Sequence, residues 1–167
     1  MYGTNGPESN QSLMPYSDAD FAGCLDTRKS TGGYVIFKGN NLIAWQSKLQ
    51  GNVTLSTIEA EYVQLSVTAR ELVYFKALEG RMNGDQPTSI HCTIRGDNQG
   101  SIKLAVDPSY RRRTRHIDVH HHYVREQVEE GVIKLEYVQS KDNLADALTK
   151  PLPKPALASF TSGINLS

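Results

Sequence analysis

The chain has 167 residues, and its 18 Lys and Arg balance its 18 Asp and Glu, so its formal net charge at pH 7 is zero. This length suits one domain with a core of its own, and the charge balance by itself indicates no partner. No apolar run approaches the roughly 20 residues that span a bilayer, and no charged-then-apolar leader opens the chain, so we expect neither a membrane span nor a secretory signal.

The first part of the chain predicts three short strands. Residues 1–12 are polar and rich in Gly, Ser and Asn, which is typical of a loose arm. A first strand is expected over 13–22 and an apolar second strand over 34–37. The hairpin signal at 39–41 leads into a third apolar run at 42–45. Tight turns between short strands predict an antiparallel meander.

The hydrophobic period then becomes helical, because Ile58, Tyr62, Leu65, Ala69 and Leu72 recur at helix spacing. Ser56 or Thr57 could cap this helix and Gly80 could end it. The elements expected after it are a strand over 88–95, helices over 98–106 and 117–130, a strand over 132–138, a short helix over 143–150 and an unstructured tail from 154. This order predicts an α/β fold in which a mixed sheet carries helices on its faces.

Two cysteines, Cys24 and Cys92, occur without CxxC or CxxH spacing. A reducing intracellular compartment, cytoplasmic or nuclear, is the simpler interpretation, and both thiols are expected to be buried packing residues. Trp45 and the tyrosines are likewise expected to belong to the core.

Isolated carboxylates stand where strands end or helices begin, which is where the sites of open α/β sheets gather. They are Asp18 in the first strand, Asp97 after the fourth, Glu59 and Glu61 in the first turns of the long helix, and Asp142 and Asp146 in the last. Taken singly, most of them could be helix caps or partners of the helix dipole. Asp18 has no such role in mid-strand. We therefore expect acids from several elements to converge.

Carboxylates crowded in one place stay ionised at neutral pH if divalent cations neutralise them. Hard oxygen ligands without Cys suit Mg²⁺ or Mn²⁺. Two such ions about 4 Å apart can activate a water and stabilise the leaving oxygen of a phosphodiester.

Seven motifs in register resemble the ribonuclease H domain of copia-type LTR retrotransposon polyproteins, from about Leu13 to Pro153. They are YSDADFAG, CLDTRKSTGGYV, AWQSK, STIEAEYVQL, GDNQGSIKLA, RTRHIDVHHHYVRE and GVIKLEYVQSKDNLADALTKPLP. The resemblance implies an RNase H-like fold with a five-stranded mixed sheet, three antiparallel strands and then two parallel ones, flanked by helices. It also implies an arm over 1–12, a domain over 13–153 and a tail over 154–167.

The resemblance further implies a catalytic set of four acids, Asp18, Glu59, Asp97 and Asp146, that holds two Mg²⁺ or Mn²⁺ ions. Helix geometry does not separate Glu59 from Glu61, which point about 200° apart. Matching the motif favours Glu59, with Glu61 as the alternative. Asp142 is expected to cap the last helix.

The implied activity is that of a metal-dependent endoribonuclease that hydrolyses the RNA strand of RNA/DNA hybrids. Gln99 of the DNQ motif is the main substrate-contact candidate, and Asn98 is a weaker one. The implied partner is the reverse transcriptase domain of a parent polyprotein, and the isolated domain is expected to be a monomer.

A basic stretch, centred on the arginines before HIDVHHHY, is expected to bind the phosphate backbone of the substrate. Its substrate-binding candidates are Arg112, Arg113, Arg115 and His116. A solvated loop is the alternative. A zinc site is less favoured, because Asp118 is the one further ligand near the histidines.

Two rival functions are open. The loop 139–141 reads Gln-Ser-Lys, whereas many RNases H have a His there, and its absence would suit a nucleic-acid-binding or interaction module with weak or no turnover. Another phosphodiester enzyme, such as a DNA nuclease or integrase, would share the fold, but the EAEY and DNQ motifs point away from it.

Overall fold

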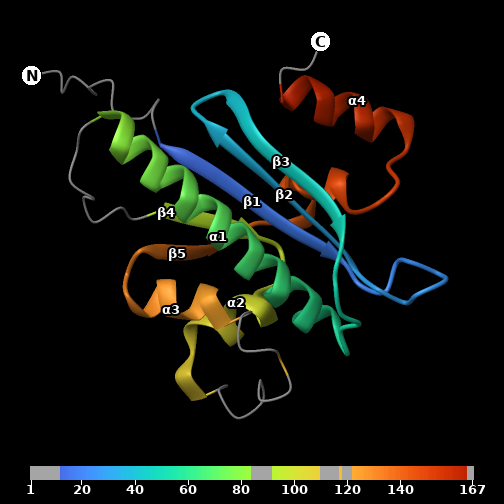
Figure 1. Cartoon of the computed structure of the whole chain (residues 1–167). Helices are drawn as coiled ribbons and strands as arrows, with labels where there is room; N and C mark the ends of the chain where they lie inside the picture. Colours follow the sequence, from blue (N-terminus) through green and yellow to red (C-terminus); the bar gives the residue numbers. More distant parts are fainter. Residues whose placement is uncertain (1–11, 84–91, 110–116, 118–121, 165–167) are drawn as a thin grey trace, which may run out of the picture.

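The computed structural model describes residues 12–83, 92–109, 117 and 122–164, and its elements are drawn in Figure 1. Within these ranges no helix has both the length and the apolar character needed to cross a membrane.

A five-stranded mixed sheet organises the molecule. Its strands are β1 (Leu13–Asp20), β2 (Thr31–Lys38), β3 (Asn41–Leu49), β4 (Cys92–Gly96) and β5 (Ile133–Tyr137). The strand order is β3-β2-β1-β4-β5. β1, β2 and β3 pair antiparallel, whereas β4 pairs parallel with both β1 and β5. The predicted fold class, three antiparallel strands followed by two parallel ones, is confirmed.

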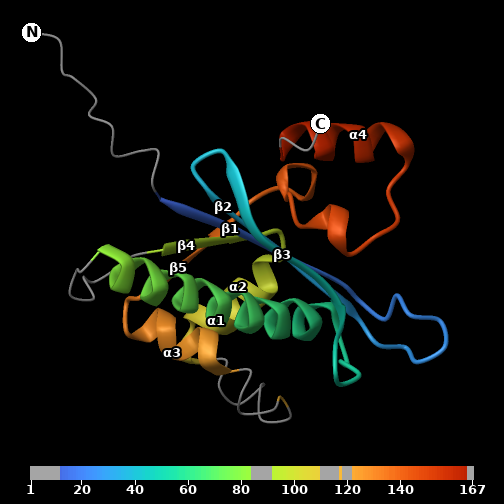
Figure 2. The same ribbon diagram turned by 45° about the horizontal axis from the view of Figure 1, so that its top comes forward.

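Helices cover both faces of this sheet. The long helix α1 (Thr57–Asn83) lies across one face together with α2 (Gln99–Val106) and α3 (Tyr123–Glu129). The helix α4 (Lys154–Gly163) lies on the opposite face, as Figure 2 shows. Two layers of packing follow, with the sheet between them.

The strand β2 is apolar on both of its faces, because a different core cluster packs against each face. Tyr34 and Ile36 belong to the large core under α1, whereas Val35 and Phe37 pack in a smaller cluster that Ile164 joins from the C-terminal end of α4. Successive strand side chains point to opposite faces. A strand buried on both faces therefore reads as a continuous apolar run, as 34–37 does.

The C-terminal part differs from the sequence expectation. The segment from Lys154, expected to be unstructured, forms α4, and its Phe160 packs with Ile164 in the smaller cluster. These two positions are four apart, so a helix brings their apolar side chains to one side. The N-terminal arm lies outside the described residues.

The helix expected over 143–150 is also absent. Two short 3₁₀ turns, Ser140–Asp142 and Asp146–Leu148, stand in that region. The cause is local, because Asn143 has extended backbone and its side-chain Oδ1 accepts a hydrogen bond from Ala145 N, 3.2 Å away. Such side-chain bonds to the backbone compete with helix formation.

Several residues expected in the core are exposed. Trp45 is 62% exposed because β3 is an edge strand, and Tyr74 and Ile58 are also exposed. Cys92 is buried as expected, but Cys24 is only half-buried. Tyr62, Leu65, Ala69 and Leu72 of the helical stripe are buried, which confirms the remainder of that prediction.

We predict that Gly33→Ala destabilises the fold at the point where the C-terminal segment crosses β2. Gly33 pairs with Asp18 of β1, and a Cβ on it would lie 2.9 Å from Thr149 Cγ2 and 3.0 Å from Leu148 Cβ. Overpacking of this kind costs about 1–3 kcal/mol. Urea unfolding measures the change in the free energy of unfolding.

Gly51→Ala is the matched control, because nothing lies within 4 Å of a Cβ built there. It is expected to change the free energy of unfolding by less than about 1 kcal/mol. Equal stabilities of the two variants would contradict the close approach at Gly33.

Candidate active site

The site begins with the parallel pairing of β1 and β4. Ser17 of β1 is paired with Gly96 of β4, so the next residue of each strand, Asp18 and Asp97, stands at the same level of the sheet. Asp18 is 1% exposed. Two acids far apart in the sequence thereby become neighbours because of strand pairing alone.

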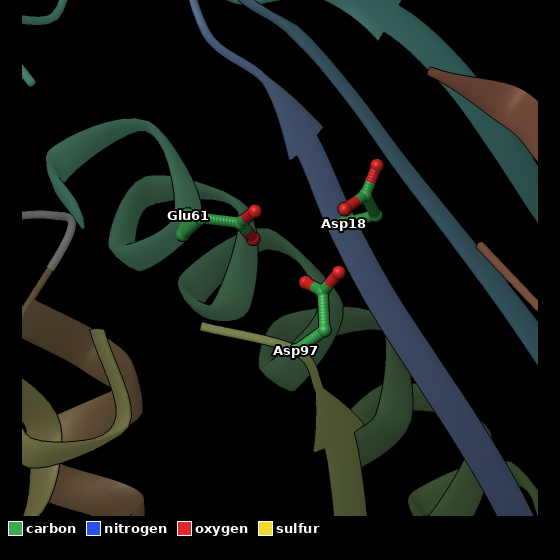
Figure 3. Close-up of side chains that lie close together, drawn as sticks. All are labelled: Asp18, Glu61 and Asp97. Atoms are coloured by element: carbon green, nitrogen blue, oxygen red, sulfur yellow. The ribbon is translucent and has the colours of Figure 1, made fainter. Parts of the chain in front are cut away.

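Glu61 completes the cluster from α1. Its carboxylate points toward those of Asp18 and Asp97 in Figure 3, and one ligand oxygen from each of the three lies within 4.8 Å of the others. Glu61 is buried, and the backbone of Ala19 makes a hydrogen bond to its side chain. Three separate elements thus supply three acids to one place.

Glu59 lies at a different position on the helix. Its Oε2 accepts a hydrogen bond from Leu55 N, 2.8 Å away, and its own backbone N donates to Ser56 Oγ at 3.2 Å. This is the chemistry of a helix N-terminus, where a Ser cap and an acid three residues later satisfy unpaired backbone donors. The structure therefore brings Glu61, and not Glu59, to Asp18 and Asp97.

Burial and mutual repulsion act on these acids. Burial first, and then the charges of Asp18 and Asp97, raise the pKa of Glu61 to about 9, against the opposing effects of the Ala19 backbone and Lys150. Burial raises the pKa of Asp18 to about 6, against the opposing effects of Thr149 and Lys150. A cation in the cluster would favour the charged form of each acid.

Asp146 approaches the cluster from the 3₁₀ turn Asp146–Leu148. It is not one of the three mutually close acids, but its Oδ1 forms an ion pair with the ammonium of Lys150, which lies 3.8 Å from Asp18 Oδ2. The Thr149 hydroxyl donates to Asp18 Oδ2 and lies 3.1 Å from the Asp146 carbonyl oxygen. Thr149 and Lys150 therefore link Asp146 to Asp18.

Further hydrogen bonds fasten this segment to the sheet. Asn143 Nδ2 donates to Ser17 O at 3.0 Å, and Ser47 Oγ of β3 donates to Leu148 O at 2.6 Å. The sequence analysis missed Asn143, Thr149 and Lys150 as parts of the site. The one available signal was the four-residue spacing of Asp146 and Lys150, which puts the two side chains on one side of a helical turn.

The substrate-contact candidates are placed differently. Asn98 is the N-cap of α2, and its Oδ1 accepts a hydrogen bond from Ser101 N at 2.9 Å. Gln99 is exposed at the first position of α2, two residues after Asp97. The basic candidates lie outside the described residues, namely Arg112, Arg113, Arg115 and His116.

The histidine cluster is described only at its end. His122 Nδ1 lies 2.9 Å from the hydroxyl of the buried Tyr62, with which it shares a hydrogen bond. In the described part of the chain, the acids Asp18, Glu61 and Asp97 form the one group of three that could hold a metal ion.

We predict opposite effects of neutralising the two glutamates when stability is measured in a chelator at pH 7. Because the folded pKa of Glu61 is raised from 4.5 to about 9, the contribution of this carboxyl to stability is full below about pH 4.5 and is lost as pH rises toward 9. Glu61→Gln removes that loss and is expected to raise the free energy of unfolding by about 1–3 kcal/mol. Thermal or urea unfolding against pH measures it.

Glu59→Gln is the control, because it weakens the acid at the helix N-terminus and is expected to lower stability by about 0.5–1 kcal/mol. A Glu61→Gln protein that is less stable at pH 7 and keeps the pH dependence of the wild type would contradict the raised pKa.

Comparison with known proteins identifies relatives of this chain. Over 158 residues the chain is 38% identical to the "Retrovirus-related Pol polyprotein from transposon RE1" of Arabidopsis thaliana, covering 93% of this chain and 10% of that protein. Over 147 residues it is 39% identical to the corresponding polyprotein from transposon TNT 1-94 of Nicotiana tabacum, covering 87% of this chain and 11% of that protein. The chain therefore spans about a tenth of the length of these relatives. No protein-family model matches it.

Solved structures support the same fold. The RNase H1 of Halobacterium salinarum NRC-1 superposes with a TM-score of 0.56 at 19% identity, covering 89% of this chain and 98% of that one. An N-terminal RNase H domain from Mycobacterium tuberculosis gives 0.55 at 18% identity, covering 82% and 95%. The chain is thus homologous to part of the copia-type Pol polyproteins and has an RNase H-like fold.

Proposed function

We propose that the chain is a metal-dependent endoribonuclease that hydrolyses the RNA strand of RNA/DNA hybrids. The observation that carries this proposal is the meeting of Asp18, Glu61 and Asp97, whose ligand oxygens lie within 4.8 Å of one another. Each comes from a different element, and no helix cap or dipole accounts for a buried acid in mid-strand. The similarity to Pol polyproteins and to RNase H structures supports the same reaction class.

The donor set fits a hard divalent cation. All three groups are carboxylates, and Mg²⁺ and Mn²⁺ prefer oxygen ligands. Two of the acids have a raised pKa, so a nearby positive charge would lower the cost of ionising them. When bound in a pair, such ions supply an activated water and stabilise the leaving oxygen of a phosphodiester.

The protein's secondary structure fixes the positions of the carboxylates in this site. Asp18 and Asp97 are fixed by the strands, and Glu61 by α1, so we assign to Glu61 the place that the motif gave to Glu59. Asp146 supplies the fourth carboxylate from the segment that Asn143 fastens to β1. Together these four acids would hold the ions.

Recognition of the hybrid would use the rim next to Asp97. Gln99 is exposed there and is free of the capping role that holds Asn98, so we propose that it contacts the minor groove. The 2′-hydroxyl is the group that distinguishes RNA from DNA in such a groove. The arginines 112, 113 and 115, with His116, remain the candidates for the phosphate backbone.

We further propose that the working partner is the reverse transcriptase domain of a parent polyprotein. The similarity to retrovirus-related Pol polyproteins supports this, because it extends over 93% of the present chain. The domain would then remove template RNA during reverse transcription.

An inactive binding module is the second candidate. It is favoured by the loop Gln139-Ser140-Lys141, which has no His, and by the ammonium of Lys150, which already pairs with Asp146. Such a module would bind hybrids without cutting them.

Asp97→Asn tests the proposal directly. Cleavage of a labelled RNA/DNA hybrid in Mg²⁺ or Mn²⁺ is expected to fall at least about 100-fold, because one carboxylate of the cluster is lost, while binding of the hybrid persists. Gel analysis of the labelled strand measures the rate, and the products are expected to carry 5′-phosphates and 3′-hydroxyls.

Asp142→Asn is the matched control, since Asp142 is exposed in the turn Ser140–Asp142 and outside the cluster. It is expected to cut at nearly the wild-type rate. Wild-type protein that cuts in neither metal would favour the binding module, and equal cutting by Asp97→Asn would remove Asp97 from the mechanism.

A further inference from the structure

Lys150 places a positive charge inside the acidic site. Its Nζ forms an ion pair with Asp146 Oδ1 and lies 3.8 Å from Asp18 Oδ2. Asp18 is 1% exposed, whereas the Lys150 side chain is 40% exposed. One ammonium from the open side of the site therefore faces two of the four carboxylates.

The local backbone holds Lys150 in this place. Lys150 N and Thr149 N both donate to Asp146 O at 3.3 Å, so one helical turn brings the lysine over the acid four residues earlier. The neighbouring Thr149 hydroxyl bonds Asp18 directly. Thr149 also approaches Gly33 closely, so this turn packs against β2. The position of Lys150 thus follows from the same contacts that hold Asp146.

The contact of the Lys150 ammonium with Asp18 and Asp146 affects both the stability of these acids and their binding of cations. A buried carboxylate without a counter-charge costs far more than an exposed one, and a cation nearby offsets that cost. A divalent cation that contacts Asp18 and Asp146 would meet the ammonium at close range, where like charges repel. A divalent cation at Asp18 and Asp146 would therefore compete with the ammonium for the same two acids.

We propose that Lys150 is the internal counter-ion of the site, which balances Asp18 and Asp146 in the ion-free protein and competes with divalent cations for them. This inference rests on the proposed function in one respect, namely that the acids bind such cations. Lys150 is then a positioning residue: it keeps the ion-free acids assembled and lowers the affinity for the ion. Removing its charge should tighten ion binding and weaken the ion-free fold.

Lys150→Met tests both consequences, because Met keeps most of the side-chain volume without the charge. Binding of Mn²⁺ to the full chain, without nucleic acid, is measured by calorimetry or by the electron paramagnetic resonance of free Mn²⁺. The apparent Kd is expected to fall about tenfold. The unfolding temperature in EDTA is expected to fall, and saturating Mn²⁺ should remove the difference from wild type.

Two variants serve as controls. Lys150→Arg keeps the charge and is expected to bind Mn²⁺ with nearly the wild-type Kd. Lys141→Met removes an exposed lysine of the same segment, in the turn Ser140–Asp142, and is expected to change neither Kd nor unfolding temperature.

The possible results separate this inference from the proposed function. Wild type that binds Mn²⁺, beside a Lys150→Met protein that binds it no more tightly, overturns the counter-ion role alone. Failure of both proteins to bind Mn²⁺ overturns the counter-ion role and the metal-dependent function together. A Lys150→Met protein that folds only with Mn²⁺ supports the inference, and one that folds in neither condition overturns it.

Discussion

The parallel pairing of β1 with β4 is the constraint on which the rest of the site depends. It sets Asp18 and Asp97 side by side although 78 positions separate them in the sequence. α1 then lays Glu61 against the pair. Each acid is fixed by secondary structure whose stability comes from apolar packing elsewhere, so the core holds together charges that would otherwise separate.

The remaining wall of the site is made by a segment with little regular structure. Asn143, Thr149 and Ser47 each contribute one hydrogen bond that binds the turns around Asp146 to the sheet. Hydrogen bonds to charged groups are stronger than neutral ones, which suits the bond from Thr149 to Asp18. The fourth acid therefore depends on a few polar contacts, whereas the other three depend on strands and a helix.

Much of the fold and of the candidate site could be predicted from the sequence. The predictions that were wrong failed for physical reasons. Asp18 was identifiable because a carboxylate in mid-strand has no capping role, and the fold class followed from the strand periods and the motifs. Glu59 and Glu61 both border the apolar stripe of one helix, so only the packed orientation of that helix separates them. The exposure of Trp45 depends on which strand lies at the edge of the sheet, and α4 depends on contacts with Val35 and Phe37 across a long chain separation.

The central claim is that these acids share divalent cations. Crystals grown with Mn²⁺ and measured at the manganese absorption edge test it most directly, because anomalous scattering locates the ion independently of the protein atoms. We expect an anomalous peak in contact with Asp18, Glu61 and Asp97, with Glu59 still bonded to Leu55 N. Saturating Mn²⁺ that leaves no peak among these three carboxylates, or a peak on Glu59 instead of Glu61, would contradict it.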